Sequence, residues 1–178
     1  MIRIVLALAM LVALAGCSSA HVSDYSNLQP RLEVEEFFEG RLTAHGVVKD
    51  RGGKVIRTFN ADIDASWSEG VGTLIEDFVF DDGETQRRIW TLHRDGKDQY
   101  IGTAGDVTGE GRLQQAGNSV FLDYVLQVPY GDGSVDVRVD DRMYLVAPDV
   151  LINESRMSKF GWRVGNLMLV ILRQPDGV

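Results

Sequence analysis

The chain has 178 residues, a formal net charge of −8 at pH 7 and a single cysteine. The excess of acidic residues disfavours binding to nucleic acid, because phosphates need basic partners and the chain holds no basic cluster. A single cysteine excludes an intramolecular disulfide and a Cys-x-x-Cys metal or redox site. A chain of this length suits one domain with a sizeable core.

The N-terminal segment is typical of a secretory leader. Arg3 supplies a positive charge, and residues 4–14 form an uncharged apolar run of eleven residues. A membrane-spanning helix needs roughly 20 such residues, so this run is too short to be one. The run closes on Leu14-Ala15-Gly16-Cys17, which resembles the lipobox of bacterial lipoproteins. We therefore predict a signal peptide over residues 1–16 and lipid attachment at Cys17.

Acylation of Cys17 would hold the protein on a membrane, since more than one acyl chain gives stable anchoring. Ser18 follows the cysteine, where retention in the inner membrane of enteric-type bacteria favours Asp. The expected location is therefore the periplasmic face of the outer membrane. An ordinary secretory leader with an incidental cysteine is the alternative. The sequence lacks a polybasic patch for anionic head groups, so membrane attachment is expected to depend on the lipid.

The segment after the leader is polar, and residues 17–30 are predicted to be a lipidated cysteine and its tether. A single β-barrel domain is predicted over residues 31–178. Its first element is a short helical turn within residues 32–40, which Gly40 terminates. We expect Phe37 and Phe38 to plug an opening in the core.

From Arg41 onward, apolar and polar residues alternate with a period of two, and turn dipeptides such as Asp82-Gly83 interrupt the alternation. Residues 134–140 are an example, because three valines alternate there with charged residues, as on a half-exposed strand. The last run, residues 166–172, is apolar on both faces and fits a closing strand. The pattern predicts about ten strands, at residues 41–48, 54–65, 71–80, 84–94, 98–104, 108–115, 118–128, 134–146, 149–157 and 163–173.

No stretch longer than a turn or two favours a helix. The sequence therefore predicts an all-β fold, an antiparallel up-and-down meander of about ten strands. Closure of the meander into a barrel would remove exposed strand edges. A two-sheet sandwich fits the periodicity almost as well.

Motifs for catalysis are absent from the sequence. It holds no G-x-S-x-G, H-E-x-x-H or G-x-x-x-x-G-K-[ST] pattern. His45 and His93 fall in separate predicted strands, which favours hydrogen-bonded or exposed histidines over metal ligands. Residues 105–111 are rich in glycine but open no helix, so they fit a bulge or a barrel corner better than a phosphate loop. We predict no enzymatic activity, no metal site and no cofactor.

The hairpin around Asp82-Gly83 gives the sharpest local prediction. A three-residue loop with a left-handed Gly83 pairs Phe80 with Glu84, and Glu76 then lies opposite Arg88. If that face is internal, the two charges must be paired or must hold a polar ligand group. A two-residue turn would shift the register by one, and Glu76 would then face Ile89.

Several stretches of the chain match a known group of proteins. Together they cover nearly all of the predicted mature chain. They are Phe37-Phe38-x-Gly40, Asp50-Arg51-x-Gly53, Asp82-Gly83 with Arg88-x-Trp90, Tyr100-x-Gly102-x-Ala104-x-Asp106-Val107-x-Gly109 and Met157-x-Lys159-Phe160-Gly161. The set resembles uncharacterised proteobacterial lipoproteins that are defined only as a domain of unknown function. One departure is Arg142, because in that group an aromatic residue often follows the paired aspartates, which are Asp140 and Asp141 in this chain.

The resemblance implies a lipocalin-like (calycin-type) barrel in the bacterial envelope, with no established activity and no catalytic residues to carry over. The chain is also similar to proteins encoded near genes for unsaturated or cyclopropane fatty-acid modification, which hints at lipid biology.

The leading functional prediction is a lipid-anchored binding module, because barrels of about eight to ten strands can hold one small ligand. The expected ligand is a fatty acid or another small lipid-like molecule, with Arg88 meeting an anionic head group. The predicted ligand-binding residues are Leu74, Glu76, Phe78, Arg88, Trp90 and Tyr124. An envelope scaffold or protein-interaction module with a filled barrel is the alternative. A lipid hydrolase or isomerase ranks third, for want of a nucleophile.

Overall fold

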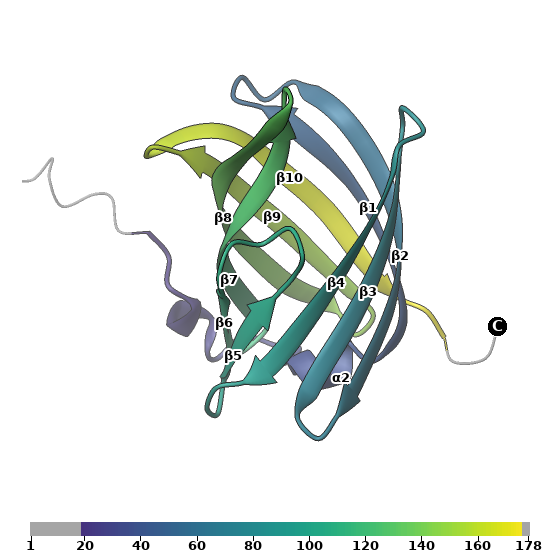
Figure 1. The fold of residues 1–178 in the computed structure, drawn as a ribbon. Coiled ribbons are helices and arrows are strands. Elements are labelled where there is room, and N and C mark those ends of the chain that lie inside the picture. The colour runs from purple at the N-terminus through teal and green to yellow at the C-terminus, as the bar shows by residue number, and fades with distance from the viewer. Residues whose placement is uncertain (1–18, 176–178) are drawn as a thin grey trace, which may run out of the picture.

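The computed structural model describes residues 19–175, so the predicted signal peptide and Cys17 lie outside the described residues. Ten antiparallel strands close into one barrel (Figure 1), in which each strand pairs with its neighbours in the chain and β1 pairs with β10. The strands are β1 (Gly40–Asp50), β2 (Val55–Ser68), β3 (Val71–Phe80), β4 (Thr85–Arg94), β5 (Gln99–Thr103), β6 (Gly111–Ala116), β7 (Ser119–Tyr130), β8 (Gly133–Ala147), β9 (Val150–Lys159) and β10 (Trp162–Arg173). The predicted all-β barrel of ten strands is confirmed, and the sandwich alternative is wrong.

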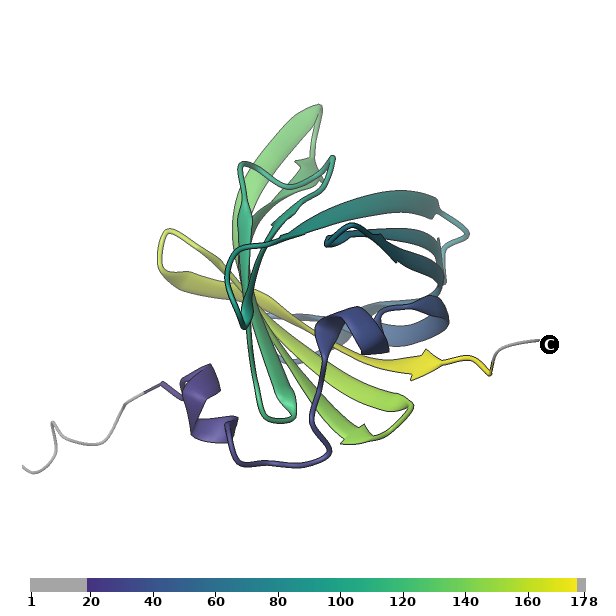
Figure 2. The same cartoon turned by 90° about the horizontal axis from the view of Figure 1, so that it is seen from below.

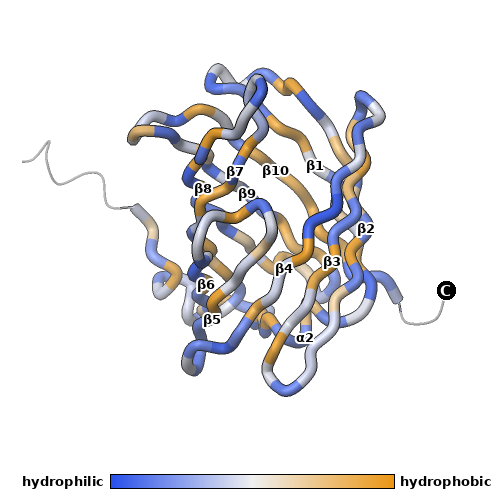
Figure 3. Tube along the Cα trace, in the orientation of Figure 1, coloured by the Kyte–Doolittle hydropathy of each residue, from blue (hydrophilic) through white to orange (hydrophobic). Residues whose placement is uncertain are grey.

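Hydrophobic and hydrophilic residues alternate along the strands (Figure 3), and this alternation divides side chains between the barrel interior and the outer surface. On β2, Phe59, Ala61 and Ile63 are buried while the residues between them are exposed. A slip of one residue would turn the polar set inward, so the core face fixes the register of each strand.

The barrel closes where β10 pairs with β1, from Leu42 opposite Arg173 to Asp50 opposite Gly165. This pairing confirms the predicted closing strand over residues 166–172, although Met168 in that run is 47% exposed. Gly165 permits the close approach, since a Cβ there would lie 2.7 Å from the carbonyl oxygen of Lys49.

A short helix, α2 (Val34–Phe37), covers the lower end of the barrel (Figure 2). It ends before Gly40, whose φ is +85°. Phe37 and Phe38 are 3% and 5% exposed and pack edge to face, with ring centroids 5.1 Å apart. The predicted helical turn and its buried phenylalanines are confirmed.

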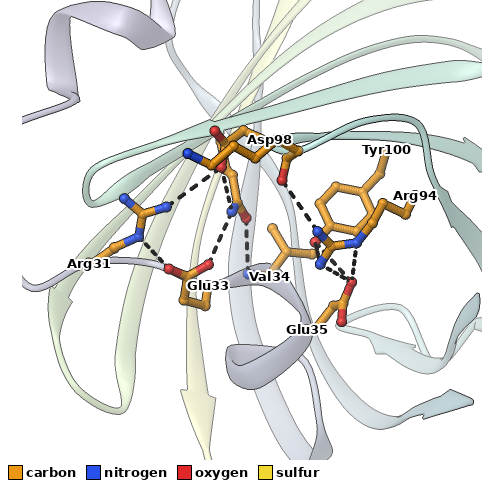
Figure 4. Close-up of polar contacts among 9 residues, drawn as sticks. Arg31, Glu33, Val34, Glu35, Arg94, Asp98 and Tyr100 are labelled. Atoms are coloured by element: carbon orange, nitrogen blue, oxygen red, sulfur yellow. Dashed lines mark hydrogen bonds and ion pairs between the residues drawn. The ribbon is translucent and has the colours of Figure 1, made fainter. Parts of the chain in front are cut away.

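Polar contacts fix α2 against the strands (Figure 4). The backbone N–H of Val34 donates to Gln115 Oε1 at 3.2 Å, and Gln115 Nε2 donates to Glu33 at 3.2 Å. On the other side of the helix, Arg94 Nε donates to Glu35 at 2.9 Å. These bonds satisfy polar groups at the start of the helix. They also hold α2, and with it the two phenylalanines, against the end of the barrel.

The segment predicted as a tether contains one structured turn, the 3-10 helix η1 (Val22–Tyr25). The Tyr25 ring packs against Phe121 and Tyr144, with centroid distances of 5.6 and 5.5 Å. Gly117 lies beneath it, and a Cβ there would sit 1.8 Å from the Tyr25 carbonyl oxygen. The polar composition of this segment gave no signal for the turn, because a single aromatic side chain fixes it to the barrel.

Replacing Phe37 by alanine is expected to lower the free energy of unfolding by about 3–5 kcal/mol, because it opens a cavity beneath the barrel end. Urea denaturation followed by circular dichroism measures the change. Phe160→Ala is the matched control, since Phe160 is 90% exposed and its loss should cost less than about 0.5 kcal/mol. A loss of unfolding free energy in Phe37→Ala that is as small as the loss in Phe160→Ala would show that α2 does not stabilise the barrel.

Candidate functional site

The β3–β4 hairpin has the three-residue loop that the sequence predicts. The Phe80 N–H donates to the Glu84 carbonyl oxygen at 2.9 Å, and Gly83 has a φ of +85°. Glu76 therefore lies opposite Arg88. The predicted register is confirmed, and the two-residue alternative is wrong.

A cavity of about 120 Å³ lies inside the barrel. Its wall is mainly apolar, with a few polar groups from different strands. The lining residues include all six that the sequence predicts as ligand-binding: Leu74, Glu76, Phe78, Arg88, Trp90 and Tyr124. An engineered cavity of roughly 150 Å³ in another protein accepts benzene, so this space fits a compact group rather than an extended chain.

The Arg88 guanidinium is the only cation among the lining residues of the cavity. Its Nε and Nη2 donate to Asp106 Oδ2 at 2.9 and 2.8 Å, and its Nη1 lies 3.6 Å from Glu76 Oε2. Burial alone lowers the pKa of Arg88, but the hydrogen bonds to Asp106 and the charge of Glu76 more than offset this and hold it above its ordinary value. Arg88 is thus already paired within the protein, and an anionic ligand would have to compete with Asp106.

Asp106 comes from the glycine-rich loop between β5 and β6, which the sequence analysis did not count among the site residues. The loop lies along β7, with the Gln127 N–H donating to the Asp106 carbonyl oxygen at 2.8 Å and Val107 forming a bridge with Leu126. This backbone pairing aims the Asp106 carboxylate at β4, where it also accepts a bond from Gln86 at 3.1 Å. The predicted barrel corner is therefore also an electrostatic contact of the site.

The loop covers an interruption in the sheet. β5 pairs with β4 only from Thr91 to Arg94, and within residues 19–175 the half of β4 over residues 85–90 pairs with β3 alone. Side chains close this seam, through the contacts of Asp106 with Gln86 and Arg88.

Glu76 is the least satisfied polar group of the site. Its Oε2 is buried and has no hydrogen-bond partner among the described residues. Burial raises the pKa of Glu76 to about 7, and Asp106 and Asp141 add to the rise while Arg88 opposes it. Near neutral pH this carboxyl group therefore exchanges readily between its charged and its protonated form.

A second polar group lines the same cavity. Asp141 on β8 accepts hydrogen bonds from Asn153 at 2.9 Å and from Ser155, both on β9. Burial raises the pKa of Asp141, although the bonds from Ser155 and Asn153 oppose the rise. Tyr124 completes the group, and burial raises the pKa of its hydroxyl well above its ordinary value.

Asp141, Asn153 and Ser155 were missed by the sequence analysis, although one signal was present. Val137 and Val139 face the core, and the same period of two places Asp141 inside as well. Asn153 and Ser155 had no such signal, because their inward side depends on how β9 pairs with β8.

Among the described residues, the lining of the cavity contains no histidine. His45 is on β1 and its Nδ1 lies 2.6 Å from Asn60 Oδ1. Over residues 19–175, no three His, Cys, Asp or Glu side chains are placed to share a metal ion. In the same range, no helix has the length and apolar character needed to cross a membrane.

Comparison with known proteins gives a family for almost the whole chain. The family described as protein of unknown function (DUF3833) matches residues 11–173. The chain belongs to this DUF3833 family. The match agrees with the predicted membership of a domain of unknown function, and a search of curated proteins finds no match.

Solved structures similar to this DUF3833 chain share its barrel. The S-type phycobiliprotein lyase CPES from Guillardia theta is 13% identical, with a TM-score of 0.61 over 89% of this chain and 100% of the lyase. Rv2717c from M. tuberculosis is 14% identical, with a TM-score of 0.60 over 84% of this chain and 100% of that one. A DUF3598 protein from Nostoc punctiforme is 13% identical, with a TM-score of 0.55 over 82% of this chain and 51% of that one. At these identities the likeness establishes the lipocalin-like fold alone.

Proposed function

We propose that the protein is a lipid-anchored binding protein of the bacterial outer membrane, whose barrel holds the compact apolar part of a small lipid-like ligand. The observation that carries the proposal is the internal cavity, with an apolar wall and an acceptor, Glu76 Oε2, that has no hydrogen-bond partner within residues 19–175. Binding sites of this kind join apolar walls with a few convergent polar groups.

The charges of the site favour a ligand that donates a hydrogen bond. Arg88 is neutralised by Asp106, whereas Glu76, which lines the cavity, has a buried oxygen without a hydrogen bond among the described residues. An alcohol or an amide on the ligand could donate a hydrogen bond to Glu76. This bond would satisfy a buried acceptor, and a buried acceptor without a hydrogen bond costs free energy. A ligand carboxylate would add a third acidic group beside Glu76 and Asp106, which is unfavourable.

A filled-barrel scaffold is the second candidate, and the size of the cavity favours it. Sites for drug-sized ligands span roughly 300–1,000 Å³, whereas this cavity measures about 120 Å³. Under this alternative the barrel would be a rigid support, and a protein partner would bind its outer face.

Native mass spectrometry with lipid extraction separates the two candidates. The mature chain is exported with Cys17 replaced by serine, so that acyl chains on the protein are not mistaken for ligand. A stoichiometric co-purified molecule supports binding and identifies the ligand class. A bare mass that a panel of fatty acids, fatty alcohols and fatty amides leaves unchanged supports the scaffold.

Acylation has its own test, because it is independent of the cavity. Cells fed an alkyne-tagged fatty acid should label the wild-type protein and leave Cys17→Ser unlabelled. Label in both proteins, or in neither, would contradict attachment at Cys17.

Replacing Ala44 by leucine is expected to fill much of the cavity, because Ala44 is buried and lines it. The added carbons should raise the free energy of unfolding of the ligand-free chain by about 1 kcal/mol. If the barrel is a binding site, the same variant should lose its co-purified ligand. Val146→Leu on the outer face is the control, and it should change neither stability nor ligand content.

A further inference from the structure

The turn between β9 and β10 carries two large apolar side chains in water. Phe160 is 90% exposed and Trp162 is 76% exposed. Phe160 and Gly161 have φ values of +51° and +80°. In hairpin turns with two positive φ values, the first residue is usually a polar one such as Asn or Asp. A bulky residue at positive φ is unfavourable, and an exposed one returns no packing energy to the barrel. Folding therefore gives no reason for an aromatic residue here.

Basic residues surround these aromatic rings. The Lys159 Nζ lies 5.1 Å from the centroid of the Phe160 ring. Lys49, Arg156 and Arg163 line one groove on the outer wall beside the hairpin. The groove also holds Glu154 and Asp140, and Asp140 pairs with Arg142 there. Within residues 19–175, Lys49, Arg156, Lys159 and Arg163 form no ion pair, although the chain as a whole carries a net charge of −8. Four positive charges of an acidic protein thus lie outside any ion pair of the described residues, near two highly exposed aromatic residues.

The N-terminus of the described chain lies at the same groove. Ser19 lines it together with Arg163, and Figure 1 shows the first described residues on the same side of the barrel as the β9–β10 turn. Cys17 is two residues before Ser19, and two extended residues span at most about 7 Å. Acyl chains on Cys17 would therefore enter the bilayer close to this hairpin.

We propose that the β9–β10 hairpin is a second membrane contact, in which Phe160 and Trp162 insert into the interfacial layer of the anchoring bilayer. Lys159, Arg163, Lys49 and Arg156 then face the lipid phosphates. Aromatic rings with a polar edge favour this interfacial layer, and nearby basic residues are attracted to anionic head groups. The nearness of the bilayer rests on the proposed acylation of Cys17. The contact would hold the barrel in one orientation, which an anchor on a short tether cannot do alone.

Tryptophan fluorescence in vesicles tests this contact. The mature protein is extracted from bacterial membranes and reconstituted into phosphatidylethanolamine–phosphatidylglycerol vesicles, with or without brominated acyl chains. Subtracting the spectrum of Trp162→Phe isolates the Trp162 emission from that of Trp67 and Trp90. We expect a blue shift of the Trp162 emission on reconstitution, and loss of most of that emission in the brominated vesicles.

A matched control places the probe on the far wall. Ile89 on β4 is 46% exposed, and β4 lies five strands from β9 in either direction around the barrel. In a Trp162→Phe background, Ile89→Trp should keep its emission in brominated vesicles. Equal quenching at both positions would overturn the proposal, because it would show no preferred orientation.

The mass of the same sample separates failure of the hairpin from failure of the anchor. Acyl chains with an unquenched Trp162 would overturn the membrane contact and leave the anchor standing. A quenched Trp162 without acyl chains would support the contact and refute the anchor. A blue shift without lipid, together with a dimeric mass, would overturn the proposal in favour of a second copy covering the hairpin.

Discussion

Replacing Arg88 by methionine is expected to lower the free energy of unfolding by about 3–5 kcal/mol at pH 7.5, because it leaves buried acidic groups without their cation. The Arg88 side chain is only 16% exposed and contacts both Asp106 and Glu76. Methionine keeps the apolar stem of the side chain, so the loss reports mainly on charge. Urea denaturation followed by tryptophan fluorescence measures it.

Arg87→Met is the matched control, one residue along the same strand. Arg87 pairs with Asp77 at 2.6 Å on the outer wall, where its side chain is 66% exposed. A surface ion pair of this kind contributes little to stability, because water and salt screen it, so the control should be nearly as stable as the wild type. Similar losses at the two positions would contradict an internal role for Arg88.

The stability of the folded chain is expected to fall as the pH rises from about 5 to 8, because of Glu76. Its pKa is about 7 in the folded chain against an ordinary value of 4.5. Between these values the folded chain holds a proton that the unfolded chain has released, so the free energy of unfolding decreases with pH. Full ionisation of Glu76 corresponds to a loss of about 3 kcal/mol. The raised pKa of Asp141 acts in the same direction.

Urea denaturation at a series of pH values measures this slope. Glu76→Gln removes the titrating group and should flatten the slope over the same range. Glu110→Gln, at an exposed loop position, should keep it. A wild-type protein whose stability rises steadily to pH 8 would show that Glu76 does not titrate in the barrel.

Most of the fold could be predicted from local patterns in the sequence. The period of two located all ten strands, and the hairpin around Asp82-Gly83 allowed two registers, of which the three-residue loop sets Glu76 against Arg88. Both signals are contained within one strand or one hairpin, so the sequence alone expresses them.

The rest of the site depends on contacts between distant segments. Asp106 meets Arg88 only because its loop lies along β7 through the bridge between Val107 and Leu126. The volume of the cavity depends on how side chains from most of the strands fill the barrel, which no periodicity records. Packing at this level decides whether a barrel is hollow or filled.

The seam beside β4 has a consequence for local motion. Elsewhere the wall opens only by breaking backbone hydrogen bonds in series, but over residues 85–90 it opens when the side-chain contacts of Asp106 part. Local opening therefore costs least at this seam. In hydrogen exchange, amides of β4 that point away from β3 should lose their protons first among the central strands. A molecule of modest size could then reach the interior through the wall while the sheet stays folded.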